Sequence, residues 1–149
     1  MQRLTQYAAD LGVTLRAVTD LDPRHPGAYC HALRHIDYLD GMNATKMRSV
    51  LAHELGHATY GDEPSMLEPE NERMERRADE WAAHFLIDVN EYRAAEERYG
   101  ANVDWIAQEL GVLRRLVVAY ERTLCRLGDY VYVKPRHGLG QYAQRWEAA

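Results

Sequence analysis

The sequence predicts an α+β fold in which a small antiparallel three-stranded sheet packs on a mainly helical body. Three observations predict it. The chain has 149 residues, which suits a single domain. Short segments in which apolar and polar residues alternate are confined to the first forty residues, and apolar residues recur at helical spacing from residue 43 onward. We expect residues 1–128 to form this domain and residues 129–149 to form a C-terminal tail.

The first forty residues predict one helix and three strands. Apolar residues recur at helical spacing over residues 2–11, which predicts a helix that ends at Gly12. Residues 22–27 contain two prolines and predict a turn. Strands are expected on either side of that turn, the last two as a hairpin, at Val13–Val18, Ala28–Leu33 and His35–Leu39.

From residue 43 the pattern is helical. Asn43 or Thr45 can cap a helix that stops by Gly61, because both side chains can accept a bond from the free N–H groups of the first turn. Four further helices are expected at Glu70–Leu86, Asn90–Tyr99, Val103–Leu110 and Val112–Leu127. Residues 130–149 have only a weak pattern and predict either a small strand and turn or a loosely packed tail.

The helix that begins near residue 43 contains an HExxH motif, His53-Glu54-Leu55-Gly56-His57. Residues i and i+4 lie one turn apart on the same helix face, so both imidazoles can reach one ion. Histidine nitrogens bind Zn²⁺ at about 2.0–2.1 Å, and Glu54 is placed to act on a water at an open coordination position. Gly56 costs about 1 kcal/mol relative to Ala inside a helix, which indicates that another backbone or a substrate approaches closely.

A catalytic zinc usually has three protein ligands, so a third donor is required. The best candidate is Glu75, which the spacing places on the packing face of the next helix; a carboxylate buried there needs a compensating cation. Asp79, one turn further, is placed to accept the second ring N–H of a ligating histidine. Three other residues are alternative third ligands: Asp62, Glu72 and His84.

These segments together resemble the ImmA/IrrE family of metallo-endopeptidases. The resemblance covers residues 45–127 and rests on RSVLAHELGH, on Tyr60-Gly61-Asp62, and on ERRADEWAAHFLI at residues 75–87. It implies a zincin-like domain and proteolysis of a helix-turn-helix transcriptional repressor, often in phages, integrative elements or stress responses. For the site it implies Zn²⁺ bound by His53, His57 and Glu75, Glu54 as the catalytic glutamate, and Asp79 at the family's Asn/Asp position.

A second signal favours a different function. Residues 103–122 resemble a helix-turn-helix and lie in a basic region, since residues 111–149 hold seven Lys or Arg and three Asp or Glu in a chain of net charge −5. A DNA-binding regulator with a structural or vestigial metal site is therefore one alternative, and a protein that sequesters a repressor without cleaving it is another. Leu113 occupies the position where a helix-capping Ser or Thr is expected, which weighs against sequence-specific DNA binding by this segment.

The remaining expectations concern the substrate and the surroundings of the protein. A strand at His35–Leu39 could pair with an extended substrate. No apolar run approaches the roughly 18 residues of a membrane span, and no secretory signal begins the chain, so we expect a cytoplasmic protein without a membrane partner. Cys30 and Cys125 have no CxxC partner and are expected to be reduced. Oxyanion stabilisation could come from Tyr60, His31, His35 or His84.

Overall fold

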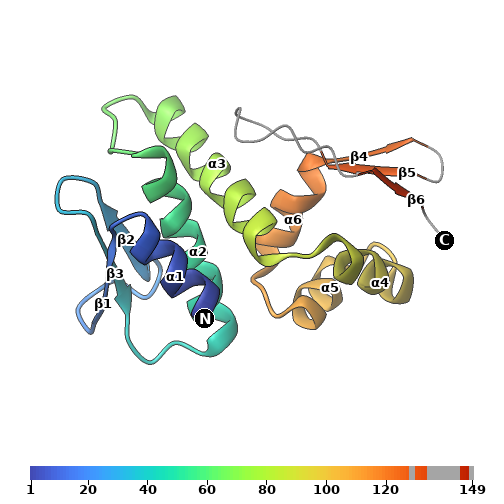
Figure 1. The fold of residues 1–149 in the computed structure, drawn as a ribbon, viewed down its shortest axis with the longest axis horizontal. Helices are drawn as coiled ribbons and strands as arrows, with labels where there is room; N and C mark the ends of the chain where they lie inside the picture. The colour runs from blue at the N-terminus through green and yellow to red at the C-terminus, as the bar shows by residue number, and fades with distance from the viewer. Residues whose placement is uncertain (128–129, 134–144, 148–149) are drawn as a thin grey trace.

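The computed structural model describes residues 1–127, 130–133 and 145–147. Within these residues the chain forms an α+β fold of six helices and two small sheets (Figure 1). The first half contains α1 (Gln2–Asp10), β1 (Thr14–Val18), β2 (Gly27–Cys30), β3 (His35–Leu39) and α2 (Ala44–Tyr60). The second half contains α3 (Glu68–Leu86), α4 (Val89–Tyr99), α5 (Val103–Leu110), α6 (Arg114–Thr123), β4 (Leu124–Leu127), β5 (Tyr130–Val133) and β6 (Arg145–Glu147).

The N-terminal sheet is mixed, so the prediction of an antiparallel sheet is wrong. Its order is β1-β3-β2, with β1 parallel to β3 and β2 antiparallel to β3. The alternation of side chains is the same in both kinds of pairing, and therefore the sequence pattern carried no information on direction. The segment 31–34 between β2 and β3 forms a tight hairpin, whereas the longer segment 19–26 crosses from one edge of the sheet to the other. As a result β3 is the central strand and β2 is an edge.

Helix α2 lies between this sheet and α3 (Figure 1). Asn43 caps it by accepting a hydrogen bond from the backbone N–H of Lys46, and Gly61 ends it in the left-handed conformation, as expected. Its middle, from Ser49 to Gly56, is buried on all sides. A helix covered in this way by a sheet and a second helix holds its side chains in fixed positions.

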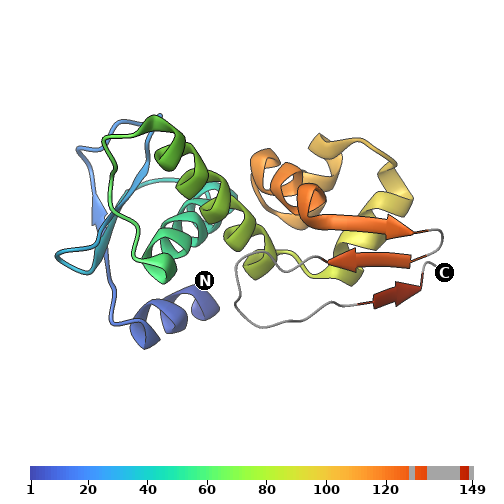
Figure 2. The ribbon, with the colours of Figure 1, turned by 90° about the horizontal axis from the view of Figure 1, so that it is seen from above.

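Helix α3 joins the two halves of the molecule, with α2 along its first part and α6 along its last part (Figure 2). It begins at Glu68 rather than Glu70, because Pro69 occupies the first turn, where its missing N–H has no intrahelical partner in any case. In the same half of the molecule α5 packs against both α4 and α6. The core is continuous from the sheet to α6 and includes Leu4, Ile36, Leu51, Leu55, Leu116 and Val117, all at most 1% exposed.

The last predicted helix is too long. Helix α6 ends at Thr123, and Leu124–Leu127 instead forms strand β4, which pairs antiparallel with β5; β6 pairs antiparallel with β5 on its other edge. Apolar residues at 124 and 127 fit helical spacing, but pairing with the following segment decides the outcome. The predicted tail at 129–149 thus contains β5 and β6, and its residues 129, 134–144 and 148–149 lie outside the described part. No described helix combines the length and the apolar character that crossing a bilayer requires.

Candidate metal centre

The two histidines of the HExxH motif and Glu75 meet at one point. Nε2 of His53 lies 3.1 Å from Nε2 of His57. The carboxylate of Glu75, which comes from α3, bridges the pair: its Oε2 is 3.2 Å from His53 Nε2 and its Oε1 is 3.3 Å from His57 Nε2. Among the described residues these three form the one group of His, Cys, Asp or Glu side chains with the spacing of a metal site.

The separations between the donor atoms fit a tetrahedral ion. Bonds of about 2.0–2.1 Å at a tetrahedral angle require donor atoms roughly 3.3 Å apart. The observed separations of 3.1, 3.2 and 3.3 Å match that requirement. Two imidazoles and one carboxylate leave a fourth position for water or substrate, which is the donor set of a catalytic rather than a structural zinc site.

Each histidine is oriented by a carboxylate on its other nitrogen. Nδ1 of His53 lies 2.8 Å from Oδ1 of Asp79, and Nδ1 of His57 lies 2.9 Å from Oδ2 of Asp62. A carboxylate only accepts, so each Nδ1 carries a proton and donates it, which makes Nε2 the nitrogen of each ring that an ion would bind. Metal-ligating histidines are typically held in this way.

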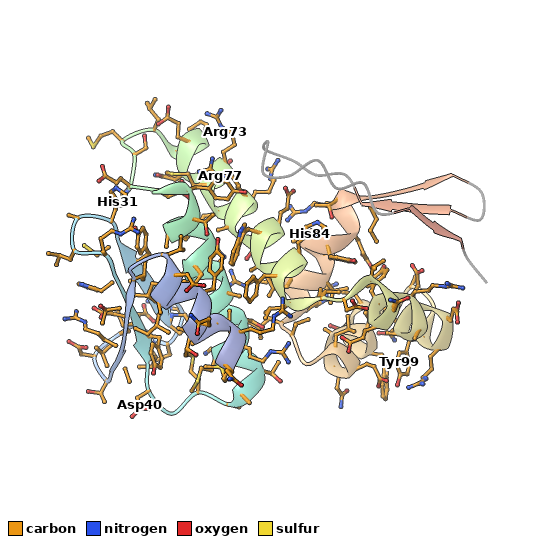
Figure 3. All side chains as sticks on the ribbon, viewed as in Figure 1. His31, Asp40, Arg73, Arg77, His84 and Tyr99 are labelled. Carbon is orange, nitrogen blue, oxygen red and sulfur yellow. The ribbon has the colours of Figure 1, made fainter. Side chains whose placement is uncertain are left out.

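Each of these carboxylates is in turn paired with an arginine. An Nη1 atom of Arg115, from α6, lies 3.2 Å from Oδ1 of Asp79. Arg77, which Figure 3 labels on α3, donates a hydrogen bond to Oδ1 of Asp62. Its guanidinium lies 4.0 Å from the ring centre of Tyr60. Each imidazole is therefore supported by a carboxylate–arginine pair: His57 by Asp62 of the α2–α3 connection with Arg77 of α3, and His53 by Asp79 of α3 with Arg115 of α6.

The carboxylates give the site a strong preference for positive charge. Burial opposes protonation of His53, but hydrogen bonds with Asp79 and Glu75 outweigh it and raise its pKa to about 9. Burial also opposes protonation of His57, whose pKa is nevertheless raised by Glu75 and Asp62. Hydrogen bonds from both histidines hold the pKa of Glu75 well below its usual range. A divalent cation satisfies this preference without the protons.

Glu54 is buried beside the cluster of His53, His57 and Glu75 and lines the same cavity. Burial raises the pKa of its carboxyl group, and the backbone N–H of Tyr29 donates a hydrogen bond to it. A Cβ on Gly27 would lie 2.7 Å from Oε1 of Glu54 and 2.6 Å from Cγ1 of Val50. Strand β2 can therefore approach Glu54 this closely only because residue 27 has no side chain.

The site opens into a cavity of about 600 Å³. Its wall is formed by the crossover segment, β2, the α2–α3 connection, α3 and the start of α6. The side chain of Glu75 is 62% exposed, whereas those of His53 and His57 are 6% and 11% exposed. Glu75 thus faces the cavity, and the expectation that its carboxylate lies buried on a packed face is wrong. Its requirement for a cation comes from the two imidazoles instead.

The alternative third ligands lie elsewhere. Asp62 contacts Nδ1 of His57 rather than the side that faces His53. Glu72 is exposed and does not belong to the cluster. His84 lies between α3 and α6, where its Nε2–H donates to Oγ1 of Thr123 at 2.7 Å (Figure 3). Of the oxyanion candidates, Tyr60, His31, His35 and His84, none lines the cavity.

Arg115 and Tyr29 were not assigned to the site from the sequence. Arg115 lines the cavity, although its place in a helix-turn-helix pattern favoured a basic solvent face. Tyr29 contacts Glu54 through its backbone, and no side-chain pattern signals such a contact. The substrate-pairing edge is also corrected: His35–Leu39 is the central strand β3, with both edges occupied, and the edge beside the site belongs to β2.

A helix with an HExxH motif, a second helix that contributes a carboxylate, and a sheet edge beside both define a metallopeptidase-type centre. The family model of the IrrE N-terminal-like domain, peptidase family M78, matches residues 34–119. This is more than half of the chain, and the protein belongs to this ImmA/IrrE metallopeptidase family. The match starts in the turn before β3 and ends within α6, so it begins earlier and ends earlier than the resemblance over 45–127. No curated protein matches the sequence.

Proposed function

We propose that the protein is a zinc-dependent endopeptidase with His53, His57 and Glu75 as metal ligands and Glu54 as the catalytic residue. The observation that carries the proposal is the triangle of donor atoms with sides of 3.1 to 3.3 Å, which has Glu54 buried beside it. When bound, zinc supplies a water with a pKa near 7 and polarises the scissile carbonyl. Membership of the metallopeptidase family supports the same chemistry.

Glu54 performs the proton transfers. Its carboxylate accepts a proton from the attacking water and delivers it to the leaving amine, so one group serves as base and then as acid. The raised pKa of Glu54 brings it closer to neutrality, which favours both halves of this cycle. The backbone N–H of Tyr29 holds the carboxylate in place for both steps.

The edge of β2 supports an extended peptide as the substrate. The N–H of Leu39 donates to the carbonyl of Pro26, and with the β2–β3 register this leaves the backbone groups of Gly27 and Tyr29 pointing away from β3. The N–H of Tyr29 is taken by Glu54, so the groups open to a substrate are the N–H and carbonyl of Gly27 and the carbonyl of Tyr29. A peptide that adds to this edge lies along the cavity and over the metal ligands. The substrate is then a segment that can become extended, in a protein that we propose to be a helix-turn-helix repressor, as the family resemblance implies.

The decisive experiment uses the repressor encoded nearest to this gene. The purified protein is incubated with it, with and without a chelator, and new termini are mapped by mass spectrometry. We expect cleavage that the chelator abolishes and that Glu54→Gln reduces by about 10²–10⁴-fold while zinc stays bound. If Glu54→Gln inactivates the repressor without cutting it, the protein sequesters its partner and is not a peptidase.

The structure weighs against the DNA-binding alternative through residues 103–122. A recognition helix reads bases with its N-terminal residues. Here the start of α6 borders the cavity: Leu113 and Arg115 line it, and the N–H of Leu113 donates to Oγ of Ser49 in α2 at 3.0 Å. We expect no shift of DNA mobility even at low salt, where phosphate contacts are strongest. A sequence-specific shift would restore the alternative.

A further inference from the structure

Arg115 is a cation whose place in the fold is fixed independently of the metal site. It belongs to α6, where its neighbours Leu116 and Val117 are fully buried. The start of the same helix is tied to α2 by the hydrogen bond from Leu113 to the buried Ser49. The helix that carries Arg115 is thus fixed both by its buried apolar residues and by the hydrogen bond at its start.

The contact made by Arg115 is with Asp79 and not with a metal ligand. Its Nη1 lies 3.2 Å from Oδ1 of Asp79, the same oxygen that accepts from Nδ1 of His53 at 2.8 Å. The Asp79 carboxylate accepts a hydrogen bond from His53 of α2 and forms an ion pair with Arg115 of α6, so its orientation is constrained from two elements rather than one. The orientation of the His53 ring follows from that of the carboxylate.

We propose that Arg115 is a positioning residue of the metal centre, which acts through Asp79 to aim Nε2 of His53 at the ion. The inference rests on the proposed metal site. On this proposal the helix-turn-helix-like segment has a role in the metal centre, because Arg115 of α6 pairs with Asp79 and Asp79 orients His53. Arg77 supplies the corresponding support to His57 through Asp62, but from the helix that also carries Glu75.

The adjacent residue offers a matched control. Arg114 has the same charge and lies on the same helix, but its Nε pairs with Asp104 at 3.0 Å and its side chain is 62% exposed. Arg114→Ala therefore removes one arginine from the start of α6 without touching Asp79. Any effect of charge or helix propensity alone is shared by Arg114→Ala and Arg115→Ala.

The test measures metal binding, not proteolysis. Zn²⁺ and Co²⁺ affinities are determined for the full chain by competition with a chelator, together with the visible absorption of bound Co²⁺. Loss of a group that orients a ligand lowers affinity by about 10–100-fold. We expect about tenfold weaker binding and a shifted Co²⁺ spectrum for Arg115→Ala, and less than twofold change with an unshifted spectrum for Arg114→Ala.

A double-mutant cycle shows whether the effect passes through Asp79. In an Asp79→Ala background, Arg115→Ala should weaken binding no further; an additional tenfold loss there would overturn the proposal. Arg115→Gln, which keeps most of the side-chain volume, provides a second variant if Arg115→Ala unfolds. Wild-type affinity and spectrum in the Arg115 variants would also overturn it, whereas a wild-type chain that binds neither ion would overturn the proposed function itself.

Discussion

The backbone of Ala78 lies directly against Gly56. A Cβ on Gly56 would be 2.9 Å from Cα and 3.0 Å from the carbonyl oxygen of Ala78. These two residues therefore fix how closely α2 and α3 pack, and with it the distance from the histidines on one helix to Glu75 on the other. The glycine inside the HExxH motif is required by this helix contact.

Replacing Gly56 with Ala tests this relationship. The new methyl group meets backbone, which cannot rotate away, so α3 must shift outward and carry Glu75 with it. We expect the free energy of unfolding to fall by about 1–3 kcal/mol, even though Ala is the better helix former. Zinc affinity should fall as well, because the donor triangle widens. Thermal denaturation and chelator competition measure the two effects, and an unchanged zinc affinity would contradict the argument.

Gly27→Ala separates catalysis from metal binding. The methyl group would overlap Oε1 of Glu54 and Cγ1 of Val50, which are ends of side chains that can move. We expect the carboxylate of Glu54 to be displaced and kcat to fall about tenfold or more, with zinc affinity unchanged. Thr14→Ala, at an exposed position of β1 outside the cavity wall, is the control and should leave kcat unaltered. A normal kcat in Gly27→Ala would show that the position of Glu54 does not depend on β2.

Zinc binding should release protons. In the metal-free protein the raised pKa of His53, about 9, keeps its imidazole protonated at pH 7.5, and the pKa of His57 is raised in the same direction. An ion must displace these protons, so we expect one to two protons released per zinc at that pH and tighter binding as pH rises toward 9. Calorimetry in buffers of different ionisation enthalpy counts them. No proton release would contradict the charge assignment.

The same pKa values set the stability of the metal-free protein. The folded-state pKa of His53 lies above its ordinary value of 6.5, so its contribution to stability is complete below pH 6.5 and is lost as pH rises through about 9. The lowered pKa of Glu75 acts in the opposite direction, contributing above pH 4.5 and losing its contribution at lower pH. We expect the Tm of the metal-free protein to be highest between pH 4.5 and pH 6.5, where both contributions are present. A Tm that rises from pH 6.5 to 9 would be inconsistent with this sign.

Thr123→Val tests the assignment of His84 as a structural residue. The hydroxyl of Thr123 accepts from His84 Nε2–H and donates to the carbonyl of Tyr120, both at 2.7 Å. Removing it takes the hydrogen-bond partner from Nε2 of His84, which is an exposed residue, and this costs about 1 kcal/mol. We expect a lower Tm with unchanged zinc affinity. Weaker zinc binding in this variant would indicate that the α3–α6 contact reaches the metal site.

The residues that meet at the site could be predicted from the sequence more completely than the strand directions of the sheet. His53, Glu54 and His57 share one helix, where spacing fixes geometry, and Glu75 follows on the next helix along the chain. Their approach in space depends on one contact, between Gly56 and Ala78, that the unusual glycine already indicated. Local periodicity is sufficient for such neighbours because helix–helix packing brings consecutive elements together.

What sequence reasoning missed depends on pairing between distant segments. Strand direction cannot be read from alternation, and the parallel pairing of β1 with β3 is what sends residues 19–26 across the sheet, where Pro23 and Pro26 form part of the cavity wall. Arg115 is forty residues from Glu75, and its spacing fits a helix-turn-helix equally well. Backbone contacts such as that from Tyr29 to Glu54 have no signature in side-chain chemistry.

The open position of Glu75 has a consequence for how the protein acquires its ion. Two ligands are set in the interior before any ion arrives, and the third waits at the mouth of the cavity. Entry and departure of a cation then require only a rotation of one surface side chain, with both helices intact. We therefore expect ion loading to be reversible, with the metal removed by a chelator and restored by dialysis while both helices stay folded.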